Sequence, residues 1–185
     1  MDAERRSIRA EPTRRELLGG LAGGVALASG VALGLSGTPS RAAVAVGDPV
    51  PWPQDVHIEA GSLLHPADWS GQVTVLVFFS TSCGYCRRHN HRVELLRRQV
   101  EAEHLPMRIL GVAQDRDPQV VRAYLAEQGL GMAFSLDYRP LRDALSARSI
   151  IPLTAVVDAA GRLRELIPGE MAEDDVLGLR RWIAR

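Results

Sequence analysis

Continuous hydrophobic runs mark the strands of this chain. The longest, Val73–Phe79, is mostly β-branched or aromatic and carries no charge, which is typical of a central strand buried on both faces. Met107–Val112 predicts a second buried strand, and Ala133–Leu136 a short third one. Two further runs, Leu153–Asp158 and Leu163–Ile167, flank a turn-forming Ala-Ala-Gly segment and predict an antiparallel hairpin.

Segments whose apolar residues recur at helical spacing separate the strands. Between Cys83 and about His104, apolar positions recur among charged residues and Pro106 follows, which predicts one long amphipathic helix. Strands that alternate with helices and end in a hairpin indicate an α/β fold, with a mixed central sheet and helices on both faces. Further helices are expected at Pro118–Gln128, Pro140–Leu145 and Ala172–Ala184.

A proline-rich segment and two short apolar pieces precede the first long strand. Gly47–Pro53 is followed by Val56–Ile58 and Leu63–Leu64, and Ala60-Gly61 separates the two pieces. This pattern predicts a small β-hairpin that covers one edge of the sheet. We therefore expect one globular domain over residues 46–185, with an N-terminal β-hairpin extension.

Residues 1–45 have the composition of an export signal. A basic stretch precedes a weakly apolar run over Leu17–Leu35, and Ala43-Val-Ala45 supplies a small-residue cleavage motif. Thr13-Arg-Arg-Glu-Leu-Leu18 is similar to the twin-arginine signal. The sequence therefore predicts a cleaved leader and a periplasmic domain exported by the twin-arginine route. The alternative is an uncleaved leader that anchors the chain in the inner membrane.

The net charge of the chain indicates whether a nucleic-acid partner is to be expected. The chain has 22 basic and 22 acidic residues. From Val46 onward, 16 arginines stand against 18 acidic residues, so the mature domain has a formal net charge of −2. This balance offers no basic footprint of the kind that nucleic acid requires, and no nucleic-acid partner is expected.

Cys83 and Cys86 are the only cysteines, and the expected fold places them where the first central strand ends and a helix begins. That position is the carboxyl edge of the sheet, where open α/β folds carry their chemistry. Three uses are open: a redox dithiol, part of a metal site, or a structural disulfide. A bridge across two residues closes a very small loop, which makes it a poor stabilising crosslink.

Cys83 has the more reactive position of the two. At the first turn of a helix, the macrodipole and the unpaired backbone N–H groups favour thiolate over thiol. Arg87 follows four residues later and adds positive charge on the same side. Cys86 lies one turn further in and is more shielded. We therefore expect Cys83 to attack a substrate disulfide and Cys86 to resolve the mixed disulfide.

Two motifs together resemble the thioredoxin superfamily: Cys83-Gly-Tyr-Cys86 after a buried strand, and Ile150–Leu163 downstream. The sequence is most similar to the exported thiol:disulfide oxidoreductases of the TlpA and ResA type. This resemblance implies a thioredoxin-like fold, protein thiol or disulfide substrates, an upstream membrane electron donor, and no cofactor beyond the Cys83–Cys86 disulfide. It also implies a cis Pro152 that faces the dithiol, with the Ile151 backbone pairing with an extended substrate segment.

The resemblance implies a reductase, with a disulfide isomerase of the same fold as the alternative. Gly84-Tyr85, the dipeptide between the cysteines, also occurs in periplasmic disulfide isomerases. The residues between two cysteines and the stabilisation of the thiolate move the reduction potential. Tyr85 and Arg87 are therefore candidate tuning residues.

Three positions depart from the family pattern. Val77 stands where thioredoxins have a buried acid, His89 where TlpA-like reductases often have a glutamate, and His91 where a proline commonly kinks the helix. The usual proton acceptor for Cys86 is thus missing. We hypothesise that His89, about 60° round the helix from Cys86, takes this role. The alternative is a solvated histidine on the helix face.

Cys83, Cys86, His89 and His91 also have the residue types of a zinc or copper site. At about 100° per residue, however, His91 points away from the other three, so no metal site is expected. Non-enzymatic copper or metal delivery on the same fold remains an alternative. A peroxidase and a binding module with an inert disulfide are further alternatives; for the peroxidase, Leu76 stands where proline is expected.

Overall fold

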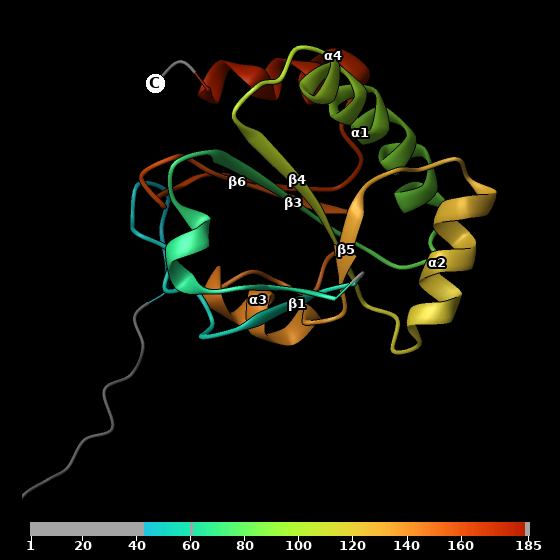
Figure 1. The fold of residues 1–185 in the computed structure, drawn as a ribbon, viewed down its shortest axis with the longest axis horizontal. Helices are drawn as coiled ribbons and strands as arrows, with labels where there is room; N and C mark the ends of the chain where they lie inside the picture. Colours follow the sequence, from blue (N-terminus) through green and yellow to red (C-terminus); the bar gives the residue numbers. More distant parts are fainter. Residues whose placement is uncertain (1–42, 60, 184–185) are drawn as a thin grey trace, which may run out of the picture. The chain divides into compact units, whose positions relative to one another are not determined.

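A computed structural model describes residues 43–59 and 61–183 (Figure 1). The predicted leader lies outside these residues, apart from its last three positions. A single five-stranded sheet with the order β5-β4-β3-β6-β7 forms the centre. β3 pairs in parallel with β4, and β4 with β5, whereas β6 pairs antiparallel with both β3 and β7. The strands are β3 (Val73–Phe79), β4 (Met107–Ala113), β5 (Ala133–Ser135), β6 (Leu153–Val157) and β7 (Leu163–Pro168).

Helices cover both faces of the sheet, as predicted. α1 (Gly84–Ala102), α2 (Pro118–Glu127) and α4 (Glu173–Leu177) pack on one face, and α3 (Tyr138–Ala144) packs on the other. Figure 1 shows α1 and α4 on one side of the sheet, and α3 with β1 on the opposite side. In the part of the chain that the structure describes, no helix is both long enough and apolar enough to cross a membrane.

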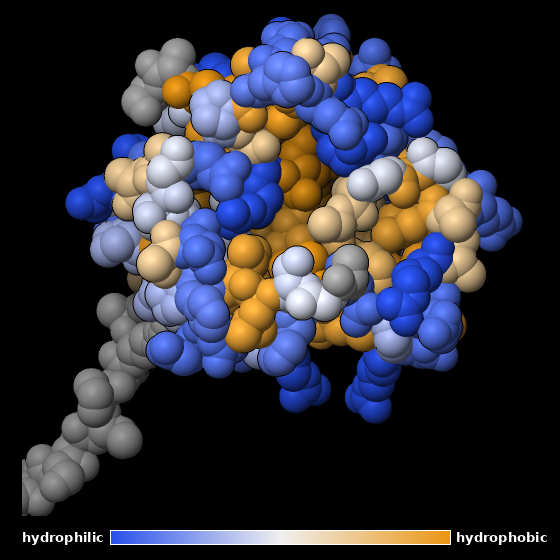
Figure 2. Space-filling view, in the orientation of Figure 1, coloured by the Kyte–Doolittle hydropathy of each residue, from blue (hydrophilic) through white to orange (hydrophobic). Residues whose placement is uncertain are grey.

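β3 is the strand that both layers share. All seven of its residues are buried. Val75 and Val77 pack in the cluster that includes α1, whereas Leu76 and Phe78 pack in the cluster that includes α3, because successive side chains of a strand point to opposite faces. The strand that leads to the two cysteines is therefore fixed from both sides. On the face seen in Figure 2, hydrophobic residues line a central hollow and hydrophilic residues surround it.

The predicted N-terminal hairpin is present and covers the β5 edge of the sheet. β1 (Val56–Ile58) and β2 (Ser62–Leu64) pair antiparallel. The backbone N–H of Glu59 donates to the carbonyl of Phe134 in β5 at 2.8 Å. The backbone N–H of His57 donates to the Asp137 carboxylate at 2.7 Å. Because an open strand edge invites pairing with other chains, this cover keeps β5 from acting as such an edge.

The end of the chain differs from the prediction of one helix over Ala172–Ala184. α4 ends at Leu177, and a 3-10 helix, η2 (Gly178–Trp182), continues it. Gly178 has low helix propensity, which favours a change of helix type at this position. In η2, the side chains of Arg181 and Trp182 both donate to the Glu165 carboxylate on β7. The tighter helix thus ties the C-terminal segment to the sheet.

A buried carboxylate joins α1 to the segment that leads into β5. Glu94 accepts hydrogen bonds from Arg97 at 2.8 Å, from Arg98 at 2.9 Å and from the backbone N–H of Gly131 at 3.0 Å. Burial raises the pKa of Glu94, but these hydrogen bonds outweigh burial and lower it to about 2. The side chain is therefore charged at neutral pH and anchors α1 beside the β4–β5 edge.

Glu94→Gln should lower the free energy of unfolding by about 2 kcal/mol, because a neutral amide cannot pair with both arginines. Urea unfolding of the oxidised protein at pH 7 measures the change. Glu101→Gln is the matched control, since Glu101 is exposed and, among the described residues, pairs with Arg97 alone; its effect should stay below about 0.5 kcal/mol. Equal losses in the two variants would contradict the structural role of Glu94.

Candidate active site

The two cysteines lie where β3 passes into α1, as predicted. Cys83 caps the N-terminus of α1, and its sulfur accepts the backbone N–H of Cys86 at 3.2 Å. The two residues form a disulfide, with their Cα atoms 5.2 Å apart. Cys83 is partly exposed, whereas Cys86 is fully buried. Only the sulfur of Cys83 is therefore open to attack on, or by, another molecule.

Asp115 positions the turn in front of Cys83, and the sequence analysis missed it. This residue follows β4, the parallel neighbour of β3, so it lies at the same sheet edge as the dithiol. Its carboxylate accepts both the backbone N–H of Thr81 at 3.0 Å and the Thr81 hydroxyl at 2.7 Å. The signal was present, since an acid just beyond a parallel strand is expected at the carboxyl edge.

The Ile151–Pro152 peptide bond is cis, as the resemblance implied. β6 runs antiparallel to β3 with Leu153 opposite Phe78, so the start of β6 lies at the edge where β3 ends. Pro152 is buried and Ile151 is partly exposed. Among the described residues, no hydrogen bond uses the backbone N–H or C=O of Ile151. Its backbone is thus free to pair with an added strand.

Tyr85 and Arg87 lie on the exposed start of α1. Tyr85 is 65% exposed, and the guanidinium of Arg88 lies 4.8 Å from the centre of its ring. Arg88 in turn pairs with Glu170 at 2.7 Å. Arg87 is exposed, and within the described ranges its side chain has no hydrogen-bond or ion-pair partner. The positive charge of Arg87 is therefore not neutralised by a neighbouring acid.

His89 is buried, which contradicts the alternative of a solvated histidine on the helix face. Its Nδ1 accepts the backbone N–H of Met171 at 3.3 Å, so the proton lies on Nε2, which donates to the Thr154 hydroxyl at 2.9 Å. Burial lowers the pKa of His89 to about 4, and the charge of Arg92 acts in the same direction. Both ring nitrogens are engaged, so this arrangement offers no lone pair to Cys86.

The His89–Thr154 pair lies beside the position that departs from the family pattern. Thr154 on β6 is opposite Val77 on β3 in the antiparallel register. Val77 and Cys86 belong to the same buried cluster between the sheet and α1. An uncharged polar pair therefore lies in the layer beneath the dithiol, next to the site where the family pattern places a buried acid.

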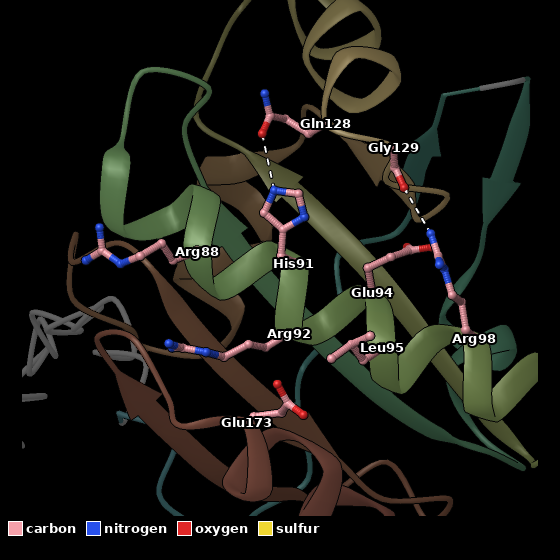
Figure 3. Close-up of a pocket in the computed structure, with 9 residues that line it drawn as sticks. All are labelled: Arg88, His91, Arg92, Glu94, Leu95, Arg98, Gln128, Gly129 and Glu173. Atoms are coloured by element: carbon pink, nitrogen blue, oxygen red, sulfur yellow. Dashed lines mark hydrogen bonds and ion pairs between the residues drawn. The ribbon is translucent and has the colours of Figure 1, made fainter.

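His91 points away from the cysteines, as its helical position indicates. Its Nε2 contacts the Gln128 side chain at 3.2 Å, over a pocket of about 520 Å³ on the outer face of α1 (Figure 3). His89 faces the sheet instead. Within the described ranges, no group of three or more His, Cys, Asp and Glu side chains is arranged to hold a metal ion.

A protein-family comparison agrees with this geometry. The family model described as Redoxin matches residues 45–180, about three quarters of the chain. No curated protein matches the sequence.

Solved structures of low sequence identity share the fold. A secreted thiol-disulfide isomerase from Corynebacterium glutamicum has a TM-score of 0.65 at 19% identity, covering 80% of this chain and 96% of its own. A putative protein disulfide isomerase from Bacteroides thetaiotaomicron has a TM-score of 0.65 at 18% identity, covering 77% and 92%. A putative thiol:disulfide interchange protein DsbE from Chlorobium tepidum has a TM-score of 0.63 at 19% identity, covering 77% and 97%. These matches confirm a thioredoxin-like fold.

The buried imidazole of His89 should make stability depend on pH. Its pKa of about 4 lies below the ordinary value of 6.5, so between these values the unfolded chain binds a proton that the folded protein excludes. The stabilisation is complete above pH 6.5 and is lost as pH falls toward 4. Urea titrations of the oxidised protein should show about 2 kcal/mol less unfolding free energy at pH 5 than at pH 7.

His89→Gln should remove most of this difference, because an amide does not titrate and can still donate to Thr154. Glu94 does not interfere, since the stability linked to its lowered pKa is present above pH 4.5 and is lost only as pH falls toward 2. If the variant kept the full difference between pH 7 and pH 5, the neutral buried His89 would be the wrong source.

Proposed function

The chain belongs to the Redoxin family, and from that premise we propose that it is a thiol:disulfide oxidoreductase that acts on protein disulfides through Cys83 and Cys86. One observation carries the proposal. Cys83 is partly exposed at a helix N-terminus, at the same edge of the sheet as the unpaired backbone of Ile151, while Cys86 is buried one turn behind it. This is the arrangement that a two-step exchange with a polypeptide needs.

In the reducing direction, the thiolate of Cys83 attacks one sulfur of a substrate disulfide. The other substrate sulfur leaves as a thiolate and takes up a proton, and a mixed disulfide with Cys83 remains. Cys86, which gives up its own proton, then attacks the Cys83 sulfur. The second substrate thiol is released, and the Cys83–Cys86 disulfide stores the two-electron oxidation. We propose no further cofactor, because this disulfide is itself the electron carrier.

The start of α1 favours the attacking thiolate. Cys86 donates its backbone N–H to the Cys83 sulfur at 3.2 Å, and a charged sulfur accepts such a bond more strongly than a neutral one. α1 is nineteen residues long and ends far from the dithiol, so its positive dipole end lies at Cys83 without a nearby negative end. The attacking role therefore belongs to Cys83.

We further propose that the substrate binds as an extended segment along Ile151. The unpaired N–H and C=O of this residue pair with the substrate backbone, in the way that an added strand extends a sheet edge. Pro152 is buried and directly precedes β6, so it helps to hold the Ile151 backbone in place for this contact. Substrates are then recognised mainly through their backbone, which suits an enzyme that acts on many different disulfides.

Three residues are proposed to tune the dithiol rather than to react. Arg87 adds an unneutralised positive charge near the thiolate. Tyr85 offers an exposed ring beside Cys83 that a substrate side chain can contact. His89 acts indirectly, because its ring nitrogens are engaged with Thr154 and Met171 and its neutral form leaves Cys86 without a buried anion close by.

We propose a reductase, with an isomerase as the second candidate. The TlpA and ResA resemblance favours a reductase. The second candidate is favoured by Gly84-Tyr85 and by two structural neighbours described as disulfide isomerases. Both activities begin with the attack of the Cys83 thiolate on a substrate disulfide. A reductase gives two electrons to the substrate and ends as the Cys83–Cys86 disulfide, whereas an isomerase lets another substrate thiol resolve the mixed disulfide and recovers its reduced dithiol.

Export to the periplasm through the twin-arginine route is also proposed, on the leader sequence at residues 1–45. The similar Corynebacterium glutamicum protein is described as secreted. A reductase outside the cytoplasm needs a source of electrons, and a membrane donor that reduces the Cys83–Cys86 disulfide would supply them.

Cys86→Ser should trap mixed disulfides between Cys83 and protein substrates, because the resolving sulfur is gone. Non-reducing gels and mass spectrometry of the purified variant with reduction-sensitive targets such as insulin will detect the adducts. Cys83→Ser is the matched control and should trap little, since Cys86 is buried. Adducts that form mainly through Cys86, or in neither variant, would contradict the proposed roles.

The reduction potential should separate reductase from isomerase. A reductase should equilibrate with glutathione buffers near the thioredoxin value of about −270 mV, and an isomerase near about −180 mV. The oxidised and reduced fractions can be quantified by thiol alkylation and mass. A value close to −180 mV, with efficient reactivation of scrambled ribonuclease, would replace the reductase by the isomerase.

A further inference from the structure

A polar cavity of about 650 Å³ opens at the sheet edge that carries the dithiol. Its walls come from the loop after β4, from the start of α3, and from the segment that precedes β6. Parallel β4 and β5 end at this edge and antiparallel β6 begins there. The volume lies in the range of ligand-binding pockets, which is about 300–1,000 Å³. The charged side chains in its lining are Asp115, Arg116, Asp137, Arg139 and Arg142, and Ser149 adds a hydroxyl group.

The two carboxylates of this cavity have hydrogen-bond partners, whereas two of its guanidinium groups have none in the part of the chain that the structure describes. Asp115 is engaged by the backbone and hydroxyl of Thr81, and Asp137 by the backbone N–H of His57. Arg116 and Arg139 are exposed, and among the described residues neither has a hydrogen-bond or ion-pair partner. Two guanidinium groups with unused hydrogen-bond donors thus line the cavity, beside two carboxylates whose hydrogen bonds are made within the protein.

The pocket on the outer face of α1 is different, although it also has arginines in its wall (Figure 3). Arg88 and Arg92 both pair with Glu170, at 2.7 Å each. Arg98 pairs with Glu94 at 2.9 Å. Each of these three guanidinium groups already pairs with a carboxylate of the protein, so none of them is an unpartnered cation that could bind a ligand.

The lining of the cavity is linked to the two segments next to the dithiol, namely the turn before Cys83 and the backbone of Ile151. Asp115 in its wall binds Thr81, two residues before Cys83. Ser149, held by Arg142 at 2.7 Å, lies two residues before Ile151. An extended chain advances about 3.3 Å per residue, so a substrate segment that pairs at Ile151 reaches Ser149 within about two to four residues.

We propose that this cavity is an anion-binding subsite for the substrate polypeptide. Arg116 and Arg139 bind the carboxylate of a Glu or Asp that lies two to four residues from the reacting cysteine. The guanidinium groups match a carboxylate in charge and in hydrogen-bond geometry. This inference rests on the proposed exchange with protein disulfides, and it names acidic segments around the disulfide as the preferred substrate class.

The test compares two synthetic peptide dimers, each joined by one disulfide and identical except for Glu or Gln at the second and fourth residues from cysteine. The dithiothreitol-reduced protein, freed of reductant, is mixed with each dimer, and acid quenching with thiol alkylation gives the second-order rate constant. At low salt the wild type should react about tenfold faster with the Glu dimer. The preference should shrink at 0.5 M NaCl, where screening is strong.

The double variant R116Q/R139Q should lose the preference by slowing the Glu dimer alone. Both side chains are exposed and have no partner within the described part of the chain, so the fold should be unaffected. R162Q/R180Q is the matched control, because it also removes two positive charges. Arg162 lies at the β6–β7 turn and Arg180 pairs with Glu103 beyond the end of α1, both away from the dithiol. This control should keep the tenfold preference.

Equal wild-type rates for the two dimers would overturn the subsite, as would a preference that survives in R116Q/R139Q or disappears in the control. Glutathione disulfide, a small disulfide with carboxylates, is a further arm. If R116Q/R139Q slowed it and left the Glu dimer unchanged, the cavity would serve a small anionic disulfide and the polypeptide assignment would be wrong. If neither peptide dimer nor insulin reacted, the proposed function itself would fail, and this inference with it.

Discussion

The hydrogen bond from the Cys86 backbone to the Cys83 sulfur is the interaction on which the site depends. The first turn of a helix leaves its N–H groups without internal partners, and Cys83 satisfies one of them. A thiolate satisfies that donor better than a thiol, so the fold itself favours the reactive form of this cysteine. The geometry requires a strand that ends and a helix that begins within a few residues, and β3 and α1 supply both.

The remaining elements hold that junction from several sides. Hydrophobic packing on both faces fixes β3, and Asp115 from the neighbouring strand fixes the turn through Thr81. Glu94 fixes α1 on its outer flank through Arg97, Arg98 and Gly131. Antiparallel β6 then brings Pro152 to the same edge. Rigid support on these sides leaves the Cys83 sulfur and the Ile151 backbone as the parts that face outward, which suits the proposed exchange with varied polypeptides.

Sequence patterns predicted the strands, the layers and the cysteine junction, because hydrophobic periodicity reports which side of an element is buried. They did not predict contacts between distant segments, such as Asp115 with Thr81. His89 shows the limit most clearly. Its spacing from Val93 and Leu96 places it on the apolar side of α1, a signal that favoured burial over solvation. Its hydrogen-bond partners, Thr154 and Met171, lie far along the chain, and no local pattern could identify them.

We propose that Cys83 alone is the reactive sulfur, activated by its position at the start of α1. Alkylation of the reduced protein with limiting iodoacetamide at pH 7, followed by peptide mass spectrometry, tests this most directly. Cys83 should react at least about tenfold faster than Cys86 and faster than a free cysteine in an unfolded peptide. Equal modification of the two cysteines, or a Cys83 no more reactive than the free cysteine, would contradict it.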